Sequence, residues 1–283
     1  MAAGPTVRRR RLGSELRKLR DANGLKLEEV AGELGVAPST LSRIETGKAP
    51  TKTAYLNQML EMYGVTDPAQ RQVLVDMARE GHRKGWWAAY EDVLATGFDI
   101  YVGLEAETTG IRSYENSLVH GLLQTADYAR AVLRELQPRH TAEQIERQVD
   151  LRMARQQRLE DEPALDLWVI HDEAVIRRVV GGPVAMRAQL GRLLKAADVP
   201  GMTLQVLPFG TGAHAGLRGP FSILEFPDRT DSQVAHVESV GGFLYLEKER
   251  EVRACTDAFD RLRASALSPG ASVDLISQVI KEL

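Results

Sequence analysis

Hydrophobic residues recur at helical spacing in two short runs near the N-terminus, with a glycine between them. The first run would give one helix an apolar face, formed by Leu27, Val30, Ala31 and Leu34. Gly35 follows and can adopt the left-handed conformation that ends a helix. Pro38 is favoured in the first turn of a second helix, whose buried edge would contain Leu41 and Ile44. The pattern therefore predicts two helices joined by a tight turn.

The outer face of the second helix would carry hydroxyl groups and a guanidinium group. Its exposed residues are predicted to be Pro38, Ser39, Thr40, Ser42 and Arg43. A short exposed helix of this composition suits the major groove of DNA, where base edges present hydrogen-bond donors and acceptors. We expect these five residues to contact bases. Residues on either side of the helix are expected to contact phosphates, and these are Lys26, Thr46, Lys48 and Lys52.

The same periodicity predicts five helices over residues 12–80, which we interpret as one DNA-binding domain. Residues 1–11 lack periodicity and end in four arginines, Arg8 to Arg11. This segment is predicted to be a flexible basic arm, either lying along DNA or serving as a solubilising tail. Polar residues flanked by glycines at 81–85 predict a linker.

Residues 86–283 alternate between helical and strand-like patterns. Four strands are expected close together, separated by turn residues, at 202–207, 221–226, 234–237 and 243–246. A further strand is expected at 165–170, and two helices at 249–266 and 272–283. Short connections favour antiparallel pairing. The predicted fold class is therefore α+β, an all-α helix-turn-helix domain followed by an α+β domain with a mostly antiparallel sheet.

Charge is distributed unevenly along the chain. Residues 1–52 contain 11 basic against 6 acidic side chains, a net charge of +5, whereas the remainder carries −8. A basic N-terminal domain suits contact with phosphates at one end of the protein. No run reaches the ~18 apolar residues of a membrane helix, and one cysteine leaves no internal disulfide. We therefore expect a cytoplasmic protein that does not contact membranes.

Residues 12–63 resemble the lambda-repressor-like (Xre) helix-turn-helix family. The motif positions are Leu34-Gly35-Val36, Ser39, Leu41 to Glu45, and Gly47. The resemblance implies a structural ion pair between Arg20, late in the first helix, and Glu45, at the end of the recognition helix. Leu27 departs from the family, which often places a phosphate-contacting glutamine there; that contact would be absent or come from Lys26 or the backbone.

The remainder of the chain is similar to actinomycete antitoxin-like Xre regulators. The matching segments include IRSYE at 111–115, GLLQT at 121–125, YAR at 128–130, DEA at 172–174 and LQVLPF at 204–209. Family membership would imply a small partner protein encoded nearby, and a C-terminal domain that dimerises or binds this partner. His120 departs from the family, which usually has proline before GLLQT.

An enzyme is a poor alternative. His171-Asp172-Glu173 and the pair His236 and Glu238 contain groups that bind metals or transfer protons. However, the sequence has no zinc-ligand spacing, phosphate-binding loop or nucleophile elbow. We therefore expect neither catalysis nor a metal or cofactor, and we interpret Asp172 and Glu173 as charges at the start of a helix.

The sequence thus predicts a dimeric, sequence-specific transcriptional regulator that binds an operator in double-stranded DNA. Two alternatives stay open. The protein could act chiefly as an antitoxin that sequesters its partner. It could instead sense a small molecule, through a pocket near Trp86-Trp87 or within residues 209–221.

Overall fold

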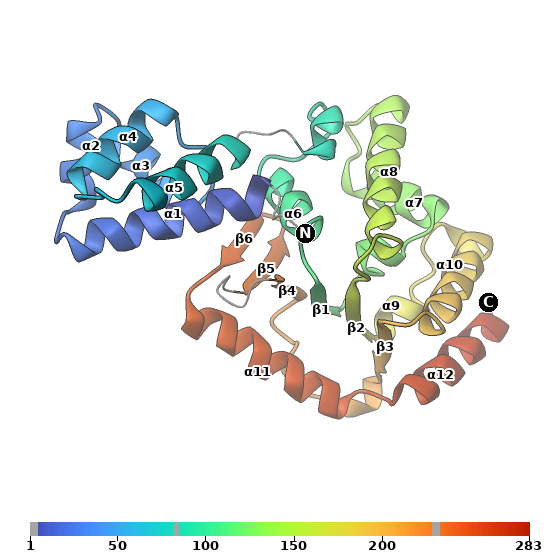
Figure 1. Ribbon diagram of the computed structural model, residues 1–283. Coiled ribbons are helices and arrows are strands. Elements are labelled where there is room, and N and C mark those ends of the chain that lie inside the picture. Colours follow the sequence, from blue (N-terminus) through green and yellow to red (C-terminus); the bar gives the residue numbers. More distant parts are fainter. Residues whose placement is uncertain (1–4, 82–84, 228–232) are drawn as a thin grey trace. The chain divides into compact units, whose positions relative to one another are not determined.

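A computed structural model describes residues 5–81, 85–227 and 233–283 of the chain. It divides into two compact units (Figure 1). The first comprises Met1–Ala89 and Asp99–Glu107, and the second Tyr90–Phe98 and Thr108–Leu283. The segment 99–107 thus groups with the first unit, although the sequence placed it in the second domain. Residues 82–84 of the predicted linker lie outside the described part of the chain.

The first unit is all-helical, and the five helices expected within residues 12–80 are present. They are α1 (Pro5–Ala22), α2 (Leu27–Glu33), α3 (Pro38–Glu45), α4 (Thr53–Met62) and α5 (Pro68–Gly81). Most of a short 3-10 helix, η1 (Trp86–Tyr90), and most of α6 (Phe98–Glu105) also belong to this unit. One core joins the five helices, because apolar side chains such as Leu16, Leu41, Leu56 and Leu74 all pack into it.

Helix α1 begins at Pro5, where the sequence predicted a flexible arm over residues 1–11. Residues 1–4 lie outside the described residues, but residues 5–11 form the first turns of the helix. Val7 is buried and extends the apolar face of α1, and its N–H donates to the Glu107 carboxylate at 3.0 Å. Arg8 forms an ion pair with Glu80. A carboxylate at a helix N-terminus stabilises the helix, so these contacts hold the basic run in helical form.

The second unit contains one six-stranded sheet in the order β3-β2-β1-β4-β5-β6. Its strands are β1 (Gly110–Glu115), β2 (Asp166–Asp172), β3 (Met202–Leu207), β4 (Phe221–Glu225), β5 (Val234–Ser239) and β6 (Gly242–Leu246). The α+β class and the strands expected from the sequence are confirmed.

Connection length explains why the sheet is mixed. Between β1 and β2 lie η2 (Gly121–Leu123), α7 (Ala126–Leu136), α8 (Ala142–Gln156) and η3 (Gln157–Leu159); between β2 and β3 lie α9 (Glu173–Arg177) and α10 (Gly182–Ala197). These crossovers make both strand pairs parallel. The pairs β1–β4, β4–β5 and β5–β6 are antiparallel. Antiparallel pairs are therefore in the majority, as predicted, although the two parallel pairs were not foreseen.

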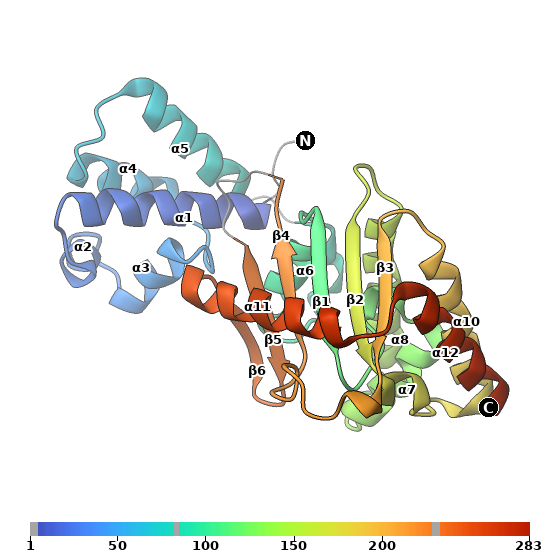
Figure 2. The ribbon, with the colours of Figure 1, turned by 90° about the horizontal axis from the view of Figure 1, so that it is seen from below.

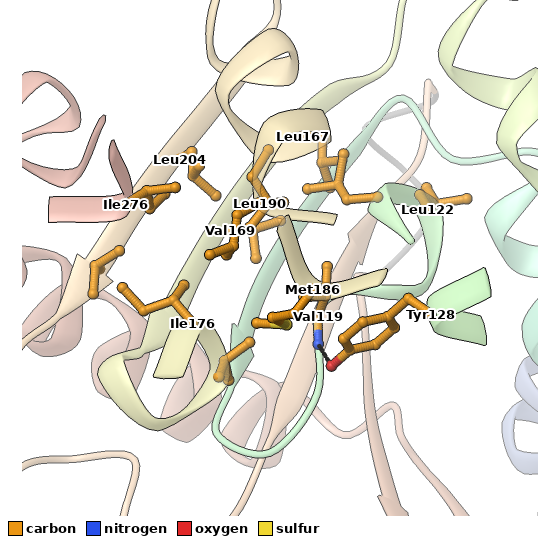
Figure 3. Close-up of a cluster of buried hydrophobic side chains, with 14 of the residues drawn as sticks. Val119, Leu122, Tyr128, Leu167, Val169, Ile176, Met186, Leu190, Leu204 and Ile276 are labelled. Carbon is orange, nitrogen blue, oxygen red and sulfur yellow. Dashed lines mark hydrogen bonds between the residues drawn. The ribbon is translucent and has the colours of Figure 1, made fainter. Parts of the chain in front are cut away.

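Helices cover both faces of the sheet. On one face, Leu167, Val169 and Leu204 pack against side chains of α7, α10 and α12 (Pro269–Glu282), including Tyr128, Leu190 and Ile276 (Figure 3). On the other face lies α11 (Glu249–Ser265) (Figure 2). Its Phe259 and Leu262 belong to a core cluster that includes side chains of all six strands.

The segment between β1 and α7 is largely buried over residues 119–124, where side chains bond to its backbone. The Val119 N–H donates to the Tyr128 hydroxyl (Figure 3), and the His120 N–H donates to Nε2 of His171 at 3.2 Å. Gln189 accepts from the Thr125 N–H and donates to the Leu123 carbonyl. A buried loop requires such partners, because unpaired backbone groups destabilise a core.

Candidate nucleic-acid interface

Two glycine turns place α3 between α2 and the chain that follows. Gly35 has a φ of +66°, and after it the Val36 N–H donates to the Ala31 carbonyl at 2.9 Å. Gly47 ends α3 in the same manner, at a φ of +67°, with the Lys48 N–H donating to the Arg43 carbonyl at 2.8 Å. Both turns follow the Schellman pattern, in which a left-handed glycine closes a helix. The observed α2–turn–α3 unit is therefore a helix-turn-helix.

Helix α3 has one buried and one exposed face. Leu41 and Ile44 are buried in the core of the first unit. Pro38, Ser39 and Arg43 are exposed, and Thr40 and Ser42 are half-buried at the edges of this outer face. All five predicted base-contacting residues thus lie on one helix, with Arg43 the longest donor among them. An arginine in this position can donate two hydrogen bonds to a guanine.

The four residues predicted to contact phosphate differ in exposure and in hydrogen bonding. Lys26, Lys48 and Lys52 are exposed. Lys26 immediately precedes α2, and Lys52 immediately precedes α4, with its ammonium 5.5 Å from the centre of the Tyr55 ring. Thr46 differs, because its hydroxyl donates to the Ser42 carbonyl at 2.7 Å. Its hydroxyl proton is therefore engaged within the helix end, which leaves the three lysines as the stronger phosphate candidates.

Arg20 and Glu45 form a buried ion pair between the ends of α1 and α3. The Arg20 guanidinium donates to both Glu45 carboxylate oxygens, at 2.7 and 3.0 Å, and to the Leu25 carbonyl at 2.9 Å. The two residues are 8% and 6% exposed. The hydrogen bonds to Glu45 raise the pKa of Arg20. Bidentate geometry of this kind fixes direction as well as distance, so the pair holds the C-terminal end of α3 against α1.

Two glycines bring α1 and α3 into backbone contact, a feature that the sequence analysis missed. A Cβ atom at Gly13 would lie 2.5 Å from the Ile44 carbonyl oxygen and 2.6 Å from that of Glu45. A Cβ atom at Gly47 would lie 2.7 Å from the Arg10 Cα. Gly13 interrupts an otherwise favourable helical sequence, and that interruption was the available signal. Close packing of backbones therefore sets the position of the recognition helix.

In the second unit, three of the residues considered for catalysis make contacts within the fold. The Asp172 carboxylate accepts from the Ala174 N–H at 2.9 Å and so caps α9, as expected for a charge at a helix start. Glu173 accepts from the Phe209 N–H at 2.8 Å and from Arg177. His236 lies beside the rings of Phe243 and Tyr245. Among the described residues, no group of three or more His, Cys, Asp or Glu side chains could hold a metal ion.

Four titratable side chains with shifted pKa values lie on the sheet or beside it: Glu115 in β1, His171 in β2, His236 in β5, and His120 in the loop after β1. Burial lowers the pKa of His120 and His171 to about 3 and that of His236 to about 4. Burial also raises the pKa of Glu115 to about 8, and the Ser113 hydroxyl opposes this by donating to its carboxylate at 2.8 Å. Each shift favours the uncharged form, because a low-dielectric environment disfavours charge. The histidines are therefore neutral at pH 7, and Glu115 is largely protonated.

These groups predict a stability maximum near pH 6.5 for the second unit. Unfolded histidines titrate near pH 6.5, so the unfolded chain binds more protons below this pH and stability falls on acidification. Glu115 acts in the opposite direction, because its folded pKa lies above its unfolded value near 4.5, and stability falls as pH rises towards 8. Each group contributes at most about 1.4 kcal/mol per pH unit.

Glu115→Gln tests this assignment. Urea unfolding from pH 4 to 9 would be followed by the fluorine NMR signal of 5-fluorotryptophan at Trp168, which lies in β2. The variant should lose the decline between pH 6.5 and 8 and retain the decline on acidification. Parallel curves for variant and wild type would contradict the raised pKa of Glu115.

Two regions were suggested for ligand binding, Trp86-Trp87 and residues 209–221, and the structure gives ring contacts for the first and the exposure of one residue in the second. The Trp86 and Trp87 rings meet edge to face, with centroids 6.0 Å apart, and the Trp87 side chain is buried. Phe209, in the short 3-10 helix η4 (Phe209–Thr211), is exposed. Neither observation by itself describes a ligand site.

Within the described residues, no helix is long and apolar enough to cross a bilayer.

Comparison with known proteins supports the division into a DNA-binding and a second domain. A family described as "Helix-turn-helix domain" matches residues 11–74, which include α2 and α3. A family described as "Domain of unknown function (DUF5753)" matches residues 98–278, well over half of the chain. No curated protein and no solved structure matches the chain. The chain therefore belongs to the DUF5753 family and carries a helix-turn-helix domain ahead of the family's defining domain.

Proposed function

We propose that this protein is a sequence-specific transcriptional regulator of the Xre type, and that it acts in the cytoplasm as a dimer on operator DNA. The observation that carries the proposal is the outer face of α3, where Arg43 and Ser39 are exposed while the opposite face is anchored by the Arg20–Glu45 pair. A recognition helix needs both properties, because base readout requires a donor that is accessible and fixed in direction.

In this mechanism the lysines supply affinity and α3 supplies selectivity. Lys26, Lys48 and Lys52 would neutralise phosphates, which gives salt-dependent binding to any sequence. Ser39, Thr40, Ser42 and Arg43 would then read base edges. One helix of this length contacts few base pairs, so two copies would bind half-sites about one DNA turn apart. We propose no catalytic role and no cofactor.

Arg43→Ala tests the base-reading role. The operator would first be identified by selecting bound sequences from a random DNA pool. The variant should then lose about 1–3 kcal/mol of discrimination between operator and random DNA for each lost arginine–guanine contact. Its salt-sensitive binding to random DNA should persist, since the lysines remain. Lys48→Ala is the matched control, and should weaken binding to both DNAs alike. Full discrimination by Arg43→Ala would exclude Arg43 from base readout.

A second candidate function is antitoxin-like binding of a small partner protein by the second unit. The loop between β3 and β4 supports it, because Phe209 and Leu217 are 58% and 68% exposed. The loop is nevertheless anchored, since the Phe209 N–H donates to Glu173 and the Gly216 N–H to His214. Exposed apolar side chains on an ordered loop are typical of protein-binding surfaces. Co-purification with the product of an adjacent gene, lost in Phe209→Ser, would support this function.

A further inference from the structure

The two ends of the recognition helix α3 are secured to different extents. At its start, the N-cap residue is Ala37, whose methyl group cannot accept a hydrogen bond, and Pro38 has no N–H to donate. At its end, the three successive carbonyls of residues 42–44 accept N–H groups from residues 46–49. Carbonyls at a helix end otherwise lack partners within the helix, and the last turn frays. The end that carries Arg43 is therefore the more firmly held.

Arg43 combines a fixed backbone with an accessible side chain. Its carbonyl accepts two backbone hydrogen bonds, from the Lys48 N–H at 2.8 Å and from the Ala49 N–H at 3.1 Å. Its side chain is nevertheless exposed. A binding site needs this combination, because a side chain can meet its ligand at one angle only when the backbone beneath it is held. The turn after α3 therefore determines the direction in which the Arg43 side chain leaves the helix.

Thr46 joins the last turn of α3 to the turn that follows it. Its N–H and its hydroxyl both donate to the Ser42 carbonyl, at 3.0 and 2.7 Å, and the hydroxyl oxygen lies 3.4 Å from the Arg43 carbonyl oxygen. A hydroxyl group has one proton to donate and two lone pairs. Since that proton is used within the protein, a phosphate oxygen would meet only the lone pairs of the Thr46 hydroxyl. Its geometry thus suits holding the helix end better than binding a phosphate.

We propose that Thr46 is a positioning residue for base readout, whose hydroxyl holds the backbone of Ser42 and Arg43 so that the Arg43 guanidinium meets a guanine at a fixed angle. The inference rests on the proposed function, in which Arg43 reads a base, and it assigns Thr46 to selectivity in place of phosphate contact. An arginine–guanine pair consists of two parallel hydrogen bonds that must align together. Movement of the last turn of α3 therefore weakens discrimination between bases before it weakens attraction to phosphates.

Thr46→Val tests the proposal, because valine keeps the branched shape of threonine but has no hydroxyl. The full chain would be titrated with the operator selected from a random pool and with random DNA. Discrimination between the two should fall by about two- to tenfold, the effect of one net hydrogen bond. In a repeated selection, the preference should weaken only at the base-pair position that Arg43→Ala also loses. Affinity for random DNA should stay within about twofold of the wild-type value, because the lysines remain.

Three control variants separate positioning from other roles. Thr46→Ser retains a hydroxyl that can donate to the Ser42 carbonyl, and should discriminate as the wild type does. Thr256→Val removes the same kind of bond from α11, where the Thr256 hydroxyl donates to the Val252 carbonyl at 3.1 Å, and should also discriminate as the wild type does. The double variant Thr46→Val/Arg43→Ala should discriminate no worse than Arg43→Ala, because a positioning residue has no effect once the side chain that it positions is gone.

The possible outcomes distinguish this inference from the proposed function. Thermal unfolding is measured beside each titration, and an unfolded Thr46→Val would be replaced by Thr46→Ala, which also lacks the hydroxyl but is the stronger helix former. An equal loss of affinity for operator and random DNA would overturn the inference and indicate a phosphate contact. Unchanged discrimination by Thr46→Val, beside a loss in Arg43→Ala, would overturn the inference alone. A wild type that selects no sequence from the pool would overturn the proposed function and the inference with it.

Discussion

Glu45→Ala is expected to destabilise the first unit by about 3–5 kcal/mol, the usual range for removing one partner of a buried ion pair. The variant removes the buried carboxylate that accepts two hydrogen bonds from Arg20 and leaves the exposed Asp21 carboxylate, 2.8 Å from Nη1, as an ion-pair partner of this guanidinium. Urea unfolding of the full chain, monitored by hydrogen exchange at the amides of α3, measures the loss of unfolding free energy in the first unit. This destabilisation approaches the whole free energy of unfolding of many domains. The amide hydrogens of α3 should therefore exchange at close to the rate of an unfolded chain.

Two controls separate burial from charge. Glu15→Ala removes the exposed Glu15–Lys18 pair, which is also on α1, and should cost less than about 1 kcal/mol. The double variant Arg20→Met/Glu45→Leu replaces both charges by apolar groups and should recover most of the lost stability. If Glu45→Ala were as mild as Glu15→Ala, the pair would not be the element that anchors the recognition helix.

Gly13→Ala is expected to destabilise the first unit by about 1–3 kcal/mol, the usual cost of overpacking, although alanine is intrinsically the better helix former. The added methyl group would meet the carbonyl oxygens of Ile44 and Glu45 at 2.5 and 2.6 Å. Neither oxygen can rotate away, because both belong to the backbone of α3, so the two helices must separate. Thermal unfolding measures the stability, and DNA titration measures the selectivity. Both should fall.

Gly32→Ala is the matched control for this prediction. Gly32 also lies within a helix, but a Cβ atom there would meet nothing within 4 Å. Its substitution should therefore stabilise the protein by about 0.5–1 kcal/mol. The same chemical change thus has opposite expected signs at two helical positions. A stabilising Gly13→Ala would show that the close approach of α1 and α3 does not constrain the recognition helix.

Local patterns predicted the elements well, because helix and strand periodicities are properties of short segments. Gly35 and Pro38 illustrate this, since Gly35 was expected to end one helix and Pro38 to open the next, and α2 and α3 end and begin there. The arginine run Arg8–Arg11 shows the limit. Its charges suggested an arm, but Val7, Glu80 and Glu107 hold it in a helix. Two of these partners are distant in sequence, so a local pattern could not reveal them.

The sequence by itself determined the helix-turn-helix, the exposure of Pro38, Ser39 and Arg43, and the α+β class, because turn glycines, helix starts and apolar faces follow from neighbouring residues. Only the tertiary structure decided how α3 is held, which backbone requires Gly13, and that β1, β2 and β3 are parallel while β6 forms an edge. These features depend on contacts between residues far apart in the chain. Periodicity shows which face of an element is buried, whereas the partner on that face is chosen by the packing of the whole core.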